Sequence, residues 1–170
     1  MKNLILVGFM GSGKSTVGKW VADRLGVSFV DMDALIERRV GKSISEIFTT
    51  EGEANFRQLE RALAQELAAG KDQVIAAGGG AVLDPENIRD FQQTGVVVAL
   101  LVTANAARAR TKTQRHRPLL EGANRWLELR RLHKERAPLY DAIPLRVDTT
   151  DKGIESVVTE VLAIHKSNQQ

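Results

Sequence analysis

The residues from Gly8 to Ser15 have the types and spacing of a site for a phosphorylated nucleotide. They read Gly8-Phe9-Met10-Gly11-Ser12-Gly13-Lys14-Ser15 and match the pattern G-x-x-x-x-G-K-[ST], between a strand-like apolar run and a helix-like segment. Glycines let the backbone turn tightly enough for successive N–H groups to point at phosphate oxygens, and the following helix N-terminus adds partial positive charge. In this pattern the Lys14 ammonium reaches the β- and γ-phosphates, and the Ser15 hydroxyl is a ligand for Mg²⁺. The loop therefore predicts binding of a nucleoside triphosphate, but it does not say what receives the phosphate.

Two carboxylates, Asp31 and Asp33, follow the next strand-like segment. Residues two apart in an extended chain project to the same side, so both would face the phosphate loop. Because Mg²⁺ usually keeps several waters, we expect Asp31 to bind it through one. We expect Asp33 to orient an acceptor hydroxyl or to take its proton. The alternative is that one of the two only caps a helix beginning near Ala34.

Arg57 and a triple glycine are further candidates. Arg57 has Glu53 four residues before it and Glu60 three residues after it, which is the spacing of a surface salt-bridge ladder on a helix. The functional alternative is an arginine fork for a carboxylate or phosphate, held in orientation by Glu60. The run 78–80 is all glycine and directly follows a predicted strand. It suits close approach of a ligand to the backbone, or else a flexible turn.

Positive charge is concentrated between Arg108 and Arg136, where ten Lys or Arg stand against three Glu, although the whole chain has a net charge of only +3. Such a patch favours a polyanionic ligand, either a nucleotide or a nucleic acid. A plain solvated basic helix is the other interpretation.

The elements that must position these residues alternate along the chain. Apolar runs predict strands, and periodic segments with capping residues predict helices. The predicted strands cover 4–7, 29–31, 74–77, 96–102 and 145–147. The predicted helices cover 14–25, a segment starting at Ser43, 53–69, a segment starting at Asp84-Pro85, a segment starting at Thr103, a segment ending near Arg136 before Pro138, and 153–165.

Strands that alternate with helices predict an α/β fold, in which a five-stranded parallel sheet has helices on both faces, as a three-layer sandwich. We expect one domain over 1–170, since neither a repeat nor a linker interrupts the pattern. Ligands should lie at the carboxyl ends of the strands, where the candidate residues are.

Composition narrows the possibilities. The chain has 170 residues, 43% hydrophobic and 26% charged, and it contains no cysteine, which excludes disulfides, thiolate metal sites and cysteine nucleophiles. No apolar run reaches the ~18–20 residues that span a bilayer, and no secretory signal is visible, so we expect a cytoplasmic protein.

Together the motifs resemble the shikimate kinase family, from about residue 4 to 150. They are the loop with Thr16, Asp31-Met32-Asp33, Gly52-Glu53 with Phe56-Arg57 and Glu60, Gly78-Gly79-Gly80, Arg117-Pro118-Leu119-Leu120, and Arg136-Ala137-Pro138-Leu139-Tyr140. The resemblance implies a P-loop kinase of the nucleoside monophosphate kinase-like fold that transfers the γ-phosphoryl group of ATP to the 3-hydroxyl of shikimate, on the route to chorismate. It also implies one Mg²⁺ per subunit, a monomer, and no nucleic-acid or membrane partner.

The resemblance further implies a role for each matching residue. Lys14, Asp33 and Arg117 would be catalytic, and Ser15, with Asp31 through water, would hold the metal. Gly78, Gly80 and Glu60 would support the acceptor site, the core loop would be 8–16, the substrate region about 32–61, and a mobile lid about 111–124. The expected ATP contacts are Gly11, Ser12, Gly13, Lys14, Ser15, Thr16, Arg110, Arg117 and Lys152, and the expected shikimate contacts are Asp33, Arg57, Gly79 and Arg136.

Two rival functions stay open on the sequence. One is another kinase of the same fold, for gluconate or a nucleoside monophosphate, which the pair Arg57 and Arg136 disfavours because two arginines ask for a carboxylate. The other is a catalytically silent relative that binds nucleotide and acts through a partner, which the presence of Lys14 and Asp33 disfavours.

Overall fold

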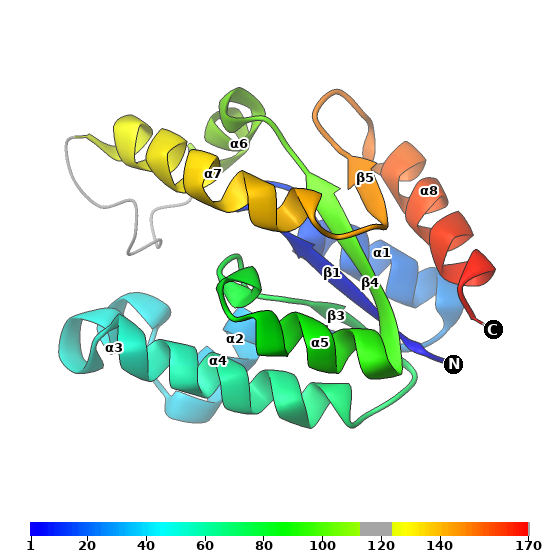
Figure 1. Cartoon of the computed structure of the whole chain (residues 1–170), viewed down its shortest axis with the longest axis horizontal. Helices are drawn as coiled ribbons and strands as arrows, with labels where there is room; N and C mark the ends of the chain where they lie inside the picture. The colour runs from blue at the N-terminus through cyan, green and yellow to red at the C-terminus, as the bar shows by residue number, and fades with distance from the viewer. Residues whose placement is uncertain (113–123, 170) are drawn as a thin grey trace.

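Five parallel strands form one sheet in the computed structural model, which describes residues 1–112 and 124–169 (Figure 1). Their order across the sheet is β2-β3-β1-β4-β5, and every neighbouring pair is parallel. The strands are β1 (Asn3–Gly8), β2 (Ser28–Asp31), β3 (Gln73–Ala76), β4 (Gly95–Leu101) and β5 (Arg146–Asp148). All five predicted strands are confirmed, with each bound shifted by one residue at most.

Side chains of β1 alternate between two hydrophobic cores. Leu4 and Leu6 belong to one core, and Ile5 and Val7 belong to the other. Since successive strand residues point to opposite faces, both faces of the sheet are buried, which explains the uninterrupted apolar run. The first core is closed by α1 (Lys14–Leu25) and α8 (Ile154–Ser167), and the second mainly by α4 (Glu53–Ala68), α5 (Pro85–Thr94) and α7 (Arg125–Asp141). The three-layer prediction is confirmed.

Local signals in the sequence start several helices where expected. Ser43 forms a complete capping box with Glu46 at the start of α3 (Ile44–Glu51). Asp84 caps α5, whose first residue is Pro85, and the Thr103 side chain accepts from Ala106 N at the start of α6 (Ala104–Thr111). These helix starts were predictable because each depends on residues within one turn.

The predicted end of α7 is wrong. The helix continues through Pro138 to Asp141, although proline lacks an N–H group and usually breaks a helix at a cost of about 3 kcal/mol. Arg136 and Tyr140 are both buried on either side of Pro138, and both bond to the same carbonyl of a distant loop. These tertiary contacts hold the last turn of the helix in place.

Parallel register brings the ends of three strands to one edge of the sheet. Leu6 in β1 and Asp31 in β2 both pair with Ala76 in β3. Gly8, Asp31 and the glycines after Ala77 therefore leave the sheet side by side, which places the candidate residues in one crevice.

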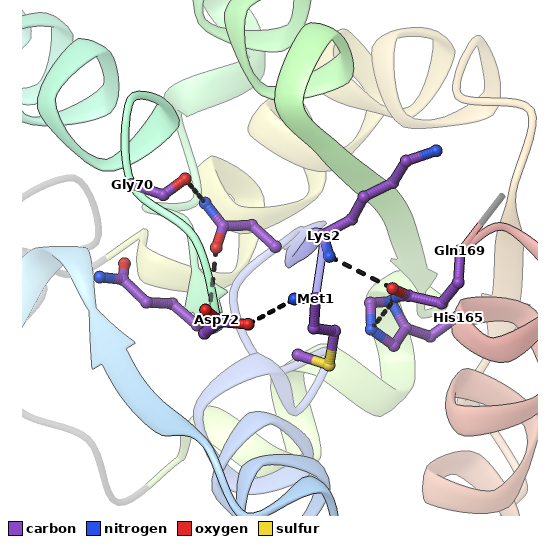
Figure 2. A network of polar contacts seen from close by, with 8 residues as sticks. Met1, Lys2, Gly70, Asp72, His165 and Gln169 are labelled. Carbon is purple, nitrogen blue, oxygen red and sulfur yellow. Dashed lines mark hydrogen bonds and ion pairs between the residues drawn. The ribbon is translucent and has the colours of Figure 1, made fainter.

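At the opposite edge of the sheet, both ends of the described chain lie together (Figure 2). Lys2 N donates to Gln169 Oε1, the Gln169 side chain contacts the buried His165 ring, and Met1 N pairs with Asp72. Burial lowers the pKa of His165. This network lies far from the phosphate loop and joins α8 to the amino end of β1.

None of the helices in residues 1–112 and 124–169 is long and apolar enough to cross a membrane.

Candidate active site

The phosphate loop turns from β1 into α1 and depends on its glycines for space. Gly11 has a φ of +77°, and a Cβ there would lie 3.0 Å from the Ala107 carbonyl oxygen in α6. Gly13, with a φ of +93°, is the N-cap of α1. The loop can therefore lie directly against α6 with its N–H groups at the positive end of α1, as an anion site requires.

Lys14 is the first residue of α1, and its ammonium lies over the loop. Nζ donates to Gly8 O at 2.8 Å and to Phe9 O at 3.2 Å. This position places a positive charge beside the N–H groups of the loop. Ser12 is buried, whereas Ser15 and Thr16 are exposed in the first turn of α1.

Ser15 and Asp31 meet beside this loop. Ser15 Oγ donates to Asp31 Oδ2 at 2.5 Å, and Asp31 Oδ1 accepts from Ala34 N at 3.2 Å. Asp31 is thus both the partner of Ser15 and the N-cap of α2 (Met32–Val40). Asp31 and Asp33 do not share one side of an extended chain, contrary to the prediction, because α2 already begins at Met32 and Asp33 lies in its first turn.

The donors Ser15 and Asp31 fit a hard cation. Both offer oxygen ligands, which Mg²⁺ prefers, and Mg²⁺ usually takes only one or two carboxylates together with water and phosphate oxygens. Within residues 1–112 and 124–169, no group of three or more His, Asp or Glu side chains converges on a metal position. A single carboxylate beside a serine hydroxyl is therefore the kind of site that a nucleotide-bound Mg²⁺ needs.

Asp33 and Glu60 lie against the same glycine. A Cβ on Gly78 would lie 2.8 Å from Asp33 Oδ1 and 2.5 Å from Glu60 Oε1. Gly78 is therefore required by the close approach of two carboxylates, one from α2 and one from α4. The alternative of a merely flexible turn does not explain these distances.

Arg57 forms the predicted ladder and also faces the triple glycine. Its guanidinium pairs with Glu60 at 2.8 Å and with Glu53 at 3.1 Å. A Cβ on Gly80 would lie 2.3 Å from Arg57 Nη1. The ladder and the functional fork are compatible, since the salt bridges hold the guanidinium against the loop.

Burial shifts the pKa values of Arg57 and Glu60. Glu60 is only 2% exposed, and desolvation raises its pKa, although Arg57 opposes that shift. Desolvation lowers the pKa of Arg57, but Glu60 and Glu53 outweigh it and the net shift is upward. Among the described residues, Arg57 Nε and Glu60 Oε1 are buried without a hydrogen-bond partner. Unpaired buried groups are costly, so this pocket is suited to a polar ligand that supplies the missing partners.

Arg136 and Tyr140 approach the triple glycine from α7. Both are 4% exposed, and both donate to Gly79 O, Arg136 Nη1 at 3.4 Å and the Tyr140 hydroxyl at 2.5 Å. Tyr140 was not predicted to have a role beyond its place in a motif. Its spacing of four residues from Arg136 puts both on one helix face, and that signal was available.

Arg110 joins the phosphate loop to the segment after β5. It donates to Gly11 O at 3.1 Å, to Thr149 O at 2.5 Å and to Thr150 O at 3.0 Å. The contact with ATP that was expected of Arg110 stays a prediction, but these bonds fix the plane of its guanidinium. Thr149 was not predicted from the sequence; it is buried, and its hydroxyl lies 3.2 Å from Ser12 O.

The two other expected nucleotide contacts have different outcomes. Lys152 Nζ pairs with Glu160 on α8 at 2.8 Å, on the exposed surface. Arg117 lies outside the described residues, as does most of the predicted lid at 111–124. The roles of both residues stay predictions.

The sheet order and the loop define the class of protein. A parallel sheet ordered β2-β3-β1-β4-β5, with a phosphate loop between its first strand and helix, is the P-loop kinase fold of the nucleoside monophosphate kinase type. The family model described as shikimate kinase matches residues 10–166, and this chain belongs to the shikimate kinase family.

Individual proteins similar to this chain include members of the same family. A shikimate kinase of Geobacter sulfurreducens is 44% identical over 168 residues, which are 99% of this chain and 93% of that protein. A shikimate kinase structure from Acinetobacter baumannii, in complex with shikimate, has a TM-score of 0.93 and 38% identity and covers 99% of this chain and 95% of its own. A gluconokinase from Sinorhizobium meliloti has a TM-score of 0.62 and 17% identity, covers 98% of this chain and 92% of its own, and shares the fold alone.

Proposed function

We propose that this chain transfers the γ-phosphoryl group of ATP to the 3-hydroxyl of shikimate, giving shikimate 3-phosphate and ADP. The observation that carries the proposal is the convergence of two arginines and two carboxylates on one triple glycine, in a chain of the shikimate kinase family. That convergence matches an acceptor that carries both a carboxylate and ring hydroxyls.

The arginines account for the carboxylate. Arg57 has a buried Nε without a partner among the described residues, and Arg136 reaches the same loop from α7. Guanidinium groups bind carboxylates through paired N–H donors, so Arg57 and Arg136 would clamp the acid group of shikimate between α4 and α7. A neutral sugar would offer these guanidinium groups hydroxyl acceptors but no negative charge and no paired carboxylate oxygens.

Asp33 and the glycine loop account for the hydroxyls. Asp33 Oδ1 faces Gly78, Gly79 O accepts a hydrogen bond from Arg136, and Gly80 lies against Arg57. Asp33 would accept a hydrogen bond from the 3-hydroxyl and hold its oxygen in line with the γ-phosphorus. When the O–P bond forms and the bond to the β-phosphate oxygen breaks, the hydroxyl proton leaves toward Asp33.

The phosphate loop supplies the charge stabilisation that phosphoryl transfer needs. Lys14 and the N–H groups of Gly11, Ser12 and Gly13 would hold the β- and γ-phosphates at the positive end of α1. Lys14 would exchange its bonds to Gly8 O and Phe9 O for phosphate oxygens. Once ATP is bound and these contacts are made, the donors would stabilise developing charge without further reorganisation during the reaction.

Mg²⁺ would be held by Ser15 Oγ directly and by Asp31 through water. When bound, Mg²⁺ would offset the negative charge of the triphosphate. Activity should be lost with a chelator and restored by Mg²⁺. Asp31→Asn should raise the Mg²⁺ concentration needed for half-maximal rate, and an unchanged requirement would contradict the assignment.

The family resemblance also supports a single domain, a monomer and a place in the cytoplasm. Light scattering at several protein concentrations tests the monomer, since a mass that rises with concentration would contradict it.

An acceptor panel tests the reaction itself. ADP release is measured with shikimate, quinate, gluconate and nucleoside monophosphates at equal concentrations. We expect shikimate to give the highest kcat/KM, and a product with phosphate on the 3-hydroxyl by NMR. A higher kcat/KM with gluconate or a nucleotide would overturn the proposal.

A further inference from the structure

The three carbonyls of the triple glycine are held in two different ways. Ala81 N donates to Gly78 O and Leu83 N donates to Gly80 O, both at 3.0 Å, so the outer carbonyls are held by local turns. Gly79 O is held instead by Tyr140, which lies 61 residues later on α7. The orientation of the central peptide therefore depends on a distant helix.

Tyr140 is a suitable donor for this task. The side chain is 4% exposed, and burial raises the pKa of its hydroxyl to about 12. The phenol therefore keeps its proton near neutral pH and can donate it in the hydrogen bond to Gly79 O. Arg136 shares the same acceptor at 3.4 Å, a longer and weaker contact.

Holding Gly79 O also directs Gly80 N–H. The described chain contains no cis peptide, and the C=O and N–H groups of a trans peptide point in opposite directions. Gly80 N–H therefore points away from Tyr140. Gly80 itself lies against the Arg57 guanidinium, so the peptide is held between α7 on one side and α4 on the other.

We propose that Tyr140 is a positioning residue for the acceptor, whose hydroxyl sets the orientation of the Gly79–Gly80 peptide that binds a ring hydroxyl. The inference rests on the proposed function, because it takes the acceptor to be a cyclic polyol acid bound against this loop. Tyr140 acts through the peptide, and it links the end of α7 to acceptor affinity.

Tyr140→Phe removes one oxygen and keeps the ring. We expect the Kd and KM for shikimate to rise about 3- to 10-fold, the usual value of one neutral hydrogen bond, with the Kd for ATP unchanged. The matched control is His133→Phe on the same helix, which removes a side-chain bond of 2.7 Å to Val102 O, outside the triple glycine. The control should leave the shikimate Kd unchanged.

Acceptor analogues sharpen the test. The loss in Tyr140→Phe should disappear with the analogue that lacks the ring hydroxyl bound by this peptide. An equal loss with every deoxy analogue, or an unchanged shikimate Kd, would overturn the inference. A fall in melting temperature alone, similar in both variants, would mean a merely structural role and would overturn it as well.

A measurement on the unsubstituted protein keeps the test independent of folding. The ¹⁵N amide resonance of Gly80 should shift saturably on addition of shikimate, and an unmoved resonance at saturation would overturn the inference. If the unsubstituted protein fails to phosphorylate shikimate, the proposed function fails. If it succeeds while Tyr140→Phe binds shikimate normally, only the role of Tyr140 fails.

Discussion

The phosphate side and the acceptor side of this crevice are built differently. The phosphate side is one continuous segment, 8–16, shaped by its own glycines and by the start of α1. The acceptor side takes Asp33 from α2, Arg57 and Glu60 from α4, the glycines after β3, and Arg136 from α7. A local anion site needs only backbone geometry, whereas a site for a carboxylate and several hydroxyls needs donors from separate elements.

The largest expected effect lies on the phosphate side. Lys14→Met removes the ammonium that stabilises charge on the transferring group, and kcat should fall at least about 10²–10³-fold. The shikimate Kd and the melting temperature should change little, since Lys14 is not part of the acceptor pocket. Single-turnover kinetics measure the loss of rate, calorimetric titration measures the shikimate Kd, and thermal denaturation measures the melting temperature. Near-normal turnover would contradict the role given to Lys14.

The second largest effect is expected from removal of the Arg57 guanidinium. Arg57→Ala should weaken shikimate binding about 10- to 100-fold, the range of a charge-assisted hydrogen bond, with little effect on ATP. Arg61→Ala is the matched control on the same helix, because Arg61 pairs with Asp84 and Asp90 outside the site. Titrations with shikimate and with ATP measure the two affinities. An equal loss of affinity for both ligands would count against the carboxylate clamp.

A smaller change tests the fit between Gly80 and Arg57. Gly80→Ala places a methyl group where the guanidinium lies, but Gly80 has a φ of −100°, so the backbone itself is not strained. The flexible arginine can shift, and we expect shikimate affinity to fall several-fold, about 1 kcal/mol, with little loss of stability. Gly153→Ala is the control, since a Cβ there meets nothing within 4 Å. Equal shikimate affinities in the two variants would contradict the close contact.

The smallest effect is a pH dependence of stability. Burial raises the pKa of Glu60, so the folded protein holds this proton more tightly than the unfolded chain. Its contribution to the free energy of unfolding is present below the unfolded pKa and is lost as pH rises through the folded pKa. The stability difference between wild type and Glu60→Gln should therefore fall as pH rises from about 4.5.

Glu66 on the same helix provides a control of opposite sign. Its hydrogen bond to Arg39 lowers its pKa, so its contribution is lost as pH falls. Urea denaturation at a series of pH values should give opposite slopes for Glu60→Gln and Glu66→Gln. Parallel slopes would contradict the burial of Glu60 as the dominant effect.

The features that were predicted correctly depend on local sequence, and those that were predicted wrongly depend on contacts between distant elements. Helix starts and buried strands were predicted, because caps and apolar runs act within a few residues. The end of α7 was not, since Pro138 is tolerated only through contacts of Arg136 and Tyr140 with Gly79. The sequence did not decide whether Asp31 or Asp33 caps the next helix. The structure shows that Asp31 is the cap, because α2 begins at Met32.

The sequence by itself determined the phosphate loop, the five parallel strands and the resemblance to the shikimate kinase family. Each depends on contiguous residues whose backbone preferences and hydrophobic pattern act locally. Only the tertiary structure decided that Asp33 and Glu60 both approach Gly78, that Gly80 lies against Arg57, and that Tyr140 holds Gly79. Those contacts join residues far apart in the chain, and close approach between helices and loops is set by packing, which no local pattern records.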